Sequence, residues 1–417
     1  MSRKEDGTVR DLSVLISGAS VAGPTLAFWL SRYGATVTVV ERAPQLRSGG
    51  QIIDLRGVGR EVARRMGLLE DMRAERTKTD GLRVINDDND VLATIPVDGF
   101  HGDGPIAELE IGRGALSRII YDAARDDVEY LFGDRISSLT QDTNKVHVSF
   151  EREAARSFDL VIAADGLHSG TRAMMFGPEK PFLRHLGSYI GLWTVRNDLG
   201  LQDIAQLYGE PGRSLMLRSV AHNTRALAAF TFNADPLDYD YRNTDLQKNI
   251  IRSRMADMGW EAARAAQQLD ETPDFYFDSF SQMVLGSWSR GRVGLVGDAA
   301  YCASPLSGHG ATISLVGAYV LAGELAQCGG DIPAGLAAYE RRLRPWINQV
   351  QALGRTQGAR MMTPHSAFGI WARNRAAQMT ELLPQPLRSS LLRPQIKVSN
   401  GFSLPQYPVA SDAGAWT

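Results

Sequence analysis

The stretch SVLISGASVAGPTLAFWLSRYGATVTVVE, residues 13–41, decides the fold of this chain. The apolar run at 13–17 predicts a buried strand, the periodic apolar residues over 22–33 predict a helix, and 36–41 reads as a second strand. Gly34 directly follows the predicted helix and suits the left-handed residue that often ends one. A strand, a helix and a strand in this order form a βαβ unit, so we predict an α/β fold built on a parallel sheet.

The turn of this unit is similar to a dinucleotide-binding fingerprint. Gly18 and Gly23 occupy the first and third positions of GxGxxG, with Ser20 in the middle, and Val21 and Ala22 lie where helix amides would meet a pyrophosphate. Glu41 follows Gly18 by 23 residues, near the spacing at which an acid binds ribose hydroxyls. The alternative is an ordinary βα turn followed by a solvated glutamate.

Composition restricts the class of protein. Hydrophobic residues make up 44% and charged residues 22%, which permits a sizeable core. A formal charge of -2 gives no basic field for nucleic acid. Two cysteines suggest a reducing compartment, the cytoplasm, and no signal peptide or membrane-length apolar run is present. Neither the histidines nor the cysteines show the spacing of a metal site.

The pattern along the chain predicts two intertwined domains. Residues 1–179 form the nucleotide-binding domain and contribute about 81–111 to a second sheet, which is completed by a strand-rich insertion at 180–287. Residues 288–330 return to the first domain, and 331–417 supply a C-terminal helix and tail. We expect helices at about 54–70, 245–258, 310–327 and 334–361. The tail beyond Pro384 lacks periodicity, and we expect it to wrap the surface or to be partly disordered.

Three motifs resemble the class A flavoprotein monooxygenases, the family of para-hydroxybenzoate hydroxylase, over residues 14–361. They are GASVAG with Glu41 and Arg42, DLVIAADGLHSGTR at 159–172, and GRVGLVGDAAYCASPLSGHGA at 291–311. The resemblance implies a Rossmann-type, glutathione-reductase-like domain that binds FAD non-covalently. It also implies an inserted strand-rich substrate domain and C-terminal helices.

The same resemblance implies roles for single residues. Asp298, after Gly297, would bind the flavin ribityl chain, and Asp165 with Gly166 would lie near the pyrophosphate and take part in reduction. Arg113 would reach the phosphate or ribityl portion, and Arg135 is a further cofactor candidate. Backbone amides near the isoalloxazine would come from Pro305, Gly308, His309, Gly310 and Ala311. Turn, cap and loop roles are the structural alternatives for these residues.

The stretch LRSGGQIIDLRGVG, residues 46–59, looks most like the tetracycline-inactivating branch of the family. There an arginine before the glycines and an aspartate after them face flavin and NADPH, which makes Arg47 and Asp54 the candidates. One extra residue separates the glycines from Asp54, so Arg56 is an alternative for the role.

Several positions depart from the family pattern. Ser20 replaces a common glycine, Tyr301 follows GDAA where histidine is usual, and His309 replaces glutamine. Polar substrate contacts of the tetracycline-inactivating enzymes fall here on Leu192 and Ala228, which argues against tetracycline as the substrate.

The implied reaction is that of a monooxygenase. NADPH or NADH would reduce FAD, oxygen would form a flavin hydroperoxide, and a bulky aromatic or polyketide-like molecule would be hydroxylated. Substrate-contact candidates, each of which core packing explains as well, are Tyr189, Trp193, Arg213, Arg218 and Phe230. The sequence identifies no catalytic acid or base. A reductase or oxidase of the same fold, or a non-catalytic flavin-binding module, remains the alternative, in a monomer or homodimer.

Overall fold

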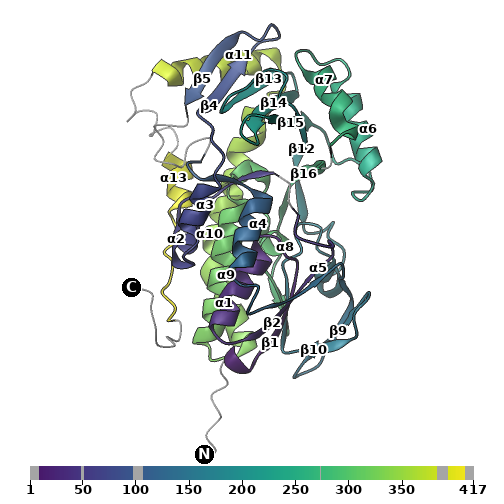
Figure 1. The fold of residues 1–417 in the computed structure, drawn as a ribbon, viewed down its shortest axis with the longest axis vertical. Helices are drawn as coiled ribbons and strands as arrows, with labels where there is room; N and C mark the ends of the chain where they lie inside the picture. The colour runs from purple at the N-terminus through teal and green to yellow at the C-terminus, as the bar shows by residue number, and fades with distance from the viewer. Residues whose placement is uncertain (1–8, 48–50, 97–106, 273, 383–392, 409–417) are drawn as a thin grey trace, which may run out of the picture.

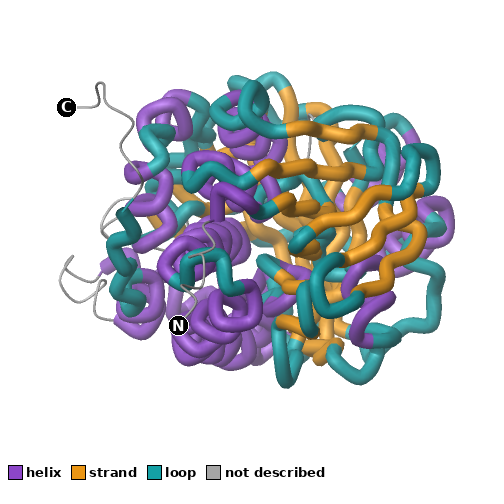
Figure 2. The backbone as a smooth tube through the Cα atoms, turned by 90° about the horizontal axis from the view of Figure 1, so that it is seen from below, coloured by secondary structure: helices purple, strands orange, loops and turns teal. Residues whose placement is uncertain are grey.

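The computed structural model describes residues 9–47, 51–96, 107–272, 274–382 and 393–408. Two large sheets occupy opposite ends of the long axis in Figure 1. Figure 2, the view from below, shows many of the helices gathered along one side of the strands.

The first sheet is the predicted nucleotide-binding sheet, and it confirms the α/β class. Its strand order is β17 (Ser289–Arg290), β18 (Val293–Leu295), β11 (Leu160–Ala163), β1 (Ser13–Ser17), β2 (Thr36–Glu41) and β7 (Glu129–Phe132). All neighbouring pairs are parallel except β17 with β18. The sheet thus contains β18, which the chain reaches about 280 residues after β1 and which lies beside β11, as expected for a domain interrupted by an insertion.

Alternation along these strands covers both faces of the sheet. Val14 and Ile16 belong to the core beneath α1 (Ala22–Arg32), α9 (Gly310–Gln327) and α10 (Ile332–Met362). Leu15 points to the opposite face. There a small sheet of β8 (Ile136–Gln141), β9 (Val146–Phe150) and β10 (Arg156–Phe158) covers it. This burial on two sides explains the uninterrupted apolar runs in the sequence.

The second sheet has seven strands. Its order is β16 (Tyr276–Met283), β12 (Leu183–Arg196), β15 (Arg225–Asn233), β14 (Arg213–Val220), β13 (Ile204–Glu210), β4 (Gly81–Ile85) and β5 (Val91–Pro96). The helices α6 (Thr244–Met255) and α7 (Ala262–Gln267), followed by η2 (Gln268–Asp270), cover one face. The other face is turned toward the nucleotide-binding domain.

A short ribbon connects the two parts, and here the prediction for 81–111 needs a correction. β6 (Glu110–Gly112) does not join the seven-stranded sheet but pairs with β3 (Ile52–Asp54). The predicted helix at 54–70 is also divided, into α2 (Val58–Arg65) and α3 (Leu69–Ala74), because Gly67 adopts φ +76° between them. The helix α4 (Arg113–Asp122) directly follows β6.

The C-terminal part contains more structure than a single helix and an aperiodic tail. A second long helix, α11 (Ala367–Leu382), packs on β5, and a short one, α13 (Arg393–Ser399), follows. Residues 393–408, called the C-terminal strap below, lie against α9 and α10. The indole of Trp346 donates to the carbonyl of Val398 at 2.8 Å, and the hydroxyl of Tyr319 donates to that of Pro405 at 2.8 Å. Within the described ranges, no helix has the length and apolar character required to cross a membrane.

Candidate functional site

The glycine turn after β1 leaves no room for side chains at two positions. Gly18 adopts φ +109°, and a Cβ there would lie 2.6 Å from the carbonyl oxygen of Ala164. A Cβ on Gly23 would lie 1.9 Å from the carbonyl oxygen of Gly18. The turn, the start of α1 and the end of β11 are therefore in direct backbone contact, which is the close approach that a pyrophosphate site needs.

The start of α1 offers hydrogen-bond donors to an anion. Val21 at its N-cap makes no side-chain cap bond, and Ala22 begins the helix. The guanidinium of Arg113 reaches the same place and donates from Nε to the hydroxyl of Ser20 at 3.0 Å. Helix amides next to an arginine suit a phosphate group, and a small serine in the middle of the fingerprint does not block it.

Glu41 ends β2 beside this turn. Its two oxygens accept hydrogen bonds from the amides of Ala19, at 2.9 Å, and Ala43, at 2.8 Å. A carboxylate has further acceptor capacity, so it can also bind two ribose hydroxyls. Three other predicted cofactor residues lie at the surface: Arg42 and Arg47 are exposed, and Arg135 forms an ion pair with Glu151.

The Asp-Gly motif ends β11 and caps a helix. Asp165 accepts hydrogen bonds from the hydroxyl of Ser169 and from the amide of Thr171 at the start of α5 (Gly170–Phe176). Asp165 therefore caps this helix, as the structural alternative for it expects. Gly166 adopts φ +87°. Sequence reasoning missed Arg172, in the same motif, although it is fully buried and binds the carbonyl of Leu167 at 2.7 Å. Its position at the end of the Asp-Gly motif, residues 159–172, was the signal that could have identified it.

The Gly-Asp motif follows β18 and lies against the start of α1. Gly297 adopts φ +66°, and a Cβ there would lie 3.0 Å from that of Ala22. Asp298 begins α8 (Asp298–Tyr301). Burial raises the pKa of Asp298, and the positive charge of Arg113 acts against this shift. The carboxylate thus lies near the same arginine that donates to Ser20.

The next loop, η3 (Pro305–Ser307) with residues 308–310, leads into α9. Pro305 and Gly310 are exposed, Gly308 adopts φ +62°, and Ala311 lies in the first turn of α9. Ser304 adopts φ +73°, and its buried hydroxyl has no partner among the described residues. The glycine cradle, the donors at α1 and this hydroxyl fit a bound flavin dinucleotide.

His309 directs its ring toward the C-terminal strap. Its Nε2 lies 2.8 Å from the hydroxyl of Ser399 in the C-terminal strap, and its Nδ1 contacts the carbonyl of Ser307. The imidazole therefore joins the loop to the strap. The backbone of His309 lies at the start of α9.

Asp54 and Arg56 lie next to the same loop. Arg56 donates from Nη2 to the carboxylate of Asp54 at 2.6 Å and from Nε to the carbonyl of Gly308 at 3.1 Å. Arg56 is 1% exposed. Arg56 is therefore a structural partner of Asp54 and connects its carboxylate to the loop at Gly308.

The three aromatic substrate candidates belong to the core beneath α6 and α7. Tyr189, Trp193 and Phe230 are buried in one cluster with side chains from these helices. The indole of Trp193 donates to the carbonyl of Ala265 at 3.0 Å, and the hydroxyl of Tyr189 accepts from the amide of Leu237 at 2.7 Å. Their packing supports the alternative explanation, a core role.

The two arginine candidates are separated. Arg213 lies near an end of β14 and forms ion pairs with Glu210 and Asp257, both at 2.5 Å. Arg218 is buried on the other face of the sheet, where it binds Glu110. Leu192 and Ala228 are also on opposite faces, because Ala228 belongs to the cluster under the helices and Leu192 does not.

Sequence reasoning overlooked β16, which borders the nucleotide-binding domain. Tyr276 and Asp278 alternate with Phe277, which packs under the helices, so they face the other way. Asp278 contacts Nε2 of His168, within the Asp-Gly motif, at 3.2 Å. Burial and the nearby charge of Asp278 raise the pKa of Tyr276, and Arg113 lowers it. The alternation in FYFDSFSQ was the signal that could have found them.

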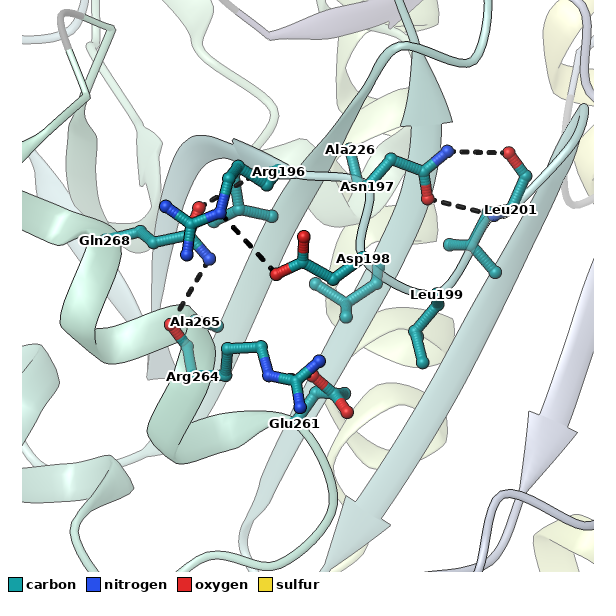
Figure 3. A pocket seen from close by; sticks show the side chains of 12 residues that line it. Arg196, Asn197, Asp198, Leu199, Leu201, Ala226, Glu261, Arg264, Ala265 and Gln268 are labelled. Carbon is teal, nitrogen blue, oxygen red and sulfur yellow. Dashed lines mark hydrogen bonds and ion pairs between the residues drawn. The ribbon is translucent and has the colours of Figure 1, made fainter.

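A hollow on the helix-covered side does not belong to this site. It lies between the end of β12 and α7, and its polar side chains already pair with one another (Figure 3). Arg196 lies 3.7 Å from Asp198, and Asn197 binds Leu201.

Comparisons with known proteins find relatives that match most of the chain. The model of the FAD binding domain family matches residues 11–353. A flavin-dependent monooxygenase of Legionella longbeachae is 35% identical over 95% of this chain and 99% of its own length. An uncharacterised protein of Mycobacterium tuberculosis is 45% identical over 82% of this chain and 92% of its own. The crystal structure of tetracycline destructase Tet(51) superposes with a TM-score of 0.81 at 32% identity, covering 95% of this chain and all of that one.

Proposed function

This chain belongs to the flavin-dependent monooxygenases of the FAD binding domain family, and from that premise we propose that it uses NADPH or NADH to hydroxylate a bulky aromatic or polyketide-like molecule. FAD supplies the oxygen-activating redox chemistry when bound. The substrate would lie between the flavin and the face of the seven-stranded sheet opposite α6 and α7.

One observation carries the proposal. The face of the sheet that α6 and α7 leave uncovered presents Tyr276, Asp278 and Arg218 to the segments that carry the flavin motifs. Asp278 contacts His168 of the Asp-Gly segment, and Arg218 binds Glu110 at the base of α4. An aromatic side chain with few polar groups beside it suits a ring-shaped substrate that carries polar substituents.

The protein's own part in the reaction is to bind and to position. The amides of α1 and Arg113 would hold the phosphates, Glu41 the ribose, and Asp298 the ribityl chain. The loop at Gly308, fixed by Arg56, would border the reactive ring. The seven-stranded sheet would cover the substrate and keep water from the reacting atoms.

The test has two stages. The FAD-loaded protein is first mixed with NADPH or NADH without oxygen, with and without each member of a panel of polycyclic phenols and polyketides, and the loss of oxidised-flavin absorbance is followed. Oxygen is then admitted, and products are searched for one added oxygen atom. The proposal expects ligand-stimulated reduction and an oxygenated product. Rapid reduction with no oxygenated product from any compound would favour a reductase or oxidase, and no reduction by either nucleotide would favour a flavin-binding module.

A further inference from the structure

Two acidic residues face each other across the ribbon that joins the two domains. Asp54 of β3 and Glu110 of β6 are directly opposite in the antiparallel register, so their side chains share one face. The side chain of Glu110 is 7% exposed and that of Asp54 is 18% exposed. Like charges in opposed cross-strand positions repel each other. Because both side chains are largely buried, little water is present to screen this repulsion.

An arginine binds the outer side of each carboxyl group. Arg218 of β14 donates from Nη1 to Oε1 of Glu110 at 2.9 Å, and its Nη2 contacts the other oxygen. Arg56 binds Asp54 at 2.6 Å and the carbonyl of Gly308 at 3.1 Å. These contacts form a row of charged residues in the order Arg218, Glu110, Asp54 and Arg56. The row runs from the face of the large sheet opposite α6 and α7 to the loop expected to border the flavin.

Glu110 is the carboxyl group of this row whose surroundings disfavour ionisation. Burial raises the pKa of Glu110 to about 7, the attraction of Arg218 opposes that shift, and the charge of Asp54 adds to it. With both carboxyl groups ionised, the row has no net charge but keeps two carboxylates in opposition. With one proton bound, that repulsion becomes a hydrogen bond and the row carries one net positive charge.

We propose that Glu110 binds a proton in the folded protein and donates it to the carboxylate of Asp54, and that Glu110 is a positioning residue. Its contacts hold Arg218 on the face of the large sheet opposite α6 and α7 and, through Asp54 and Arg56, the loop at Gly308. The proton comes from solvent, resides on an oxygen of Glu110 and returns to solvent as the pH rises. Only the role toward substrate and flavin rests on the proposed function.

The proton between Glu110 and Asp54 is tested without any turnover. Infrared difference spectra of the FAD-free protein are recorded between about pH 6 and pH 8.5, on either side of the expected titration. The wild type should lose the carbonyl stretch of a protonated carboxyl group as the pH rises. Glu110→Gln should abolish that band, because it removes the carboxyl group that binds the proton. Asp54→Asn should move the loss of the band to lower pH, because the charge of Asp54 then no longer raises the pKa of Glu110.

A matched control is Glu129→Gln, which changes a half-exposed carboxylate that pairs with Arg156 and lies outside the row. It should keep the band. Absence of the band from the folded wild type, its persistence in Glu110→Gln, or an unchanged titration in Asp54→Asn would overturn the proton between Glu110 and Asp54. The use of two variants keeps the test decisive if one of them does not fold.

The positioning role is tested by binding. The dissociation constant of FAD, measured by flavin fluorescence, should change about fivefold across the same pH range in the wild type and in Glu129→Gln. It should vary much less in Glu110→Gln and Asp54→Asn. A wild-type band together with a pH-independent FAD affinity would overturn the positioning role. If both measurements succeed and no substrate is oxygenated, the proposed function fails and this inference stands.

Discussion

The guanidinium of Arg172 donates from Nη1 to the carbonyl oxygen of Ala299 at 3.0 Å and thereby ties the segment after β11 to the segment after β18. Asp165 lies on the first segment and Asp298 on the second. The same guanidinium also binds Glu179 at 3.1 Å. Two motifs separated by more than a hundred residues are thus held in one geometry by a single buried cation.

We expect Arg172→Met to lower the free energy of unfolding by about 3 kcal/mol, because two buried carbonyl groups lose their donor. Urea unfolding of the FAD-free protein measures this change. Arg156→Met removes an arginine from a half-exposed pair with Glu129 and should cost less than about 1 kcal/mol. Equal losses in the two variants would show that Arg172 does not hold the motifs together.

Gly23→Ala should prevent FAD binding while the protein still folds. The added methyl group would lie 1.9 Å from the carbonyl oxygen of Gly18, so α1 must move away from the glycine turn. Gly170→Ala is a suitable control, since a Cβ there meets nothing within 4 Å. Flavin absorbance of the purified proteins gives the result, and circular dichroism checks the fold. A Gly23→Ala protein that retains FAD as well as the control does would contradict the close-packed turn.

Asp298→Ala should raise the dissociation constant of FAD roughly 10- to 100-fold, since a hydrogen bond to a charged acceptor contributes about 1.5 to 3 kcal/mol. Titration of the FAD-free protein with FAD, followed by fluorescence, measures the change. Asp257→Ala, at an 83% exposed aspartate that pairs with Arg213, is the control and should leave the affinity unchanged. Unchanged affinity in Asp298→Ala as well would remove Asp298 from the flavin site.

His168 should make the stability depend on pH. Burial lowers the pKa of His168, but its hydrogen bonds to Asp278 and Glu179 raise the pKa to about 9. Because the folded-state pKa is the higher one, this stabilisation is complete below about pH 6.5 and is lost as the pH rises through about 9. The loss should be on the order of 3 kcal/mol.

Chemical unfolding of the wild type at a series of pH values measures this dependence. His168→Gln should show a flatter profile over the same range. His147→Gln changes a half-exposed histidine that pairs with Asp142 and should keep the wild-type profile. If the profile of His168→Gln follows that of the wild type, another group is responsible.

The sequence predicts best where one physical requirement dominates. The strands at 13–17 and 36–41 and the helix at 310–327 have the predicted bounds, because burial on two sides demands long apolar runs. The FAD cofactor was also predictable, since glycines at fixed spacing have few other uses. Tyr189, Trp193 and Phe230 show the limit: alternation separates two faces of a strand but does not say which face a helix will cover.

Other features depend on contacts that no local pattern contains. The pairing of β6 with β3 instead of the large sheet requires knowledge of the register between residues 56 to 60 positions apart. The role of Arg218 depends on Glu110, which is 108 positions away, and the direction of the His309 ring depends on Ser399, which is 90 positions away. Only the assembled structure brings such pairs together.

The bond between His309 and Ser399 also has a consequence for the order of biosynthesis. The loop before α9 is translated well before the C-terminal strap that supports it from behind, and domains fold as the ribosome delivers them. The glycine turn and β18 can thus form early, while the loop stays unsupported until residues 393–408 have been made. We therefore expect chains that lack the strap to capture FAD less tightly than chains that contain it.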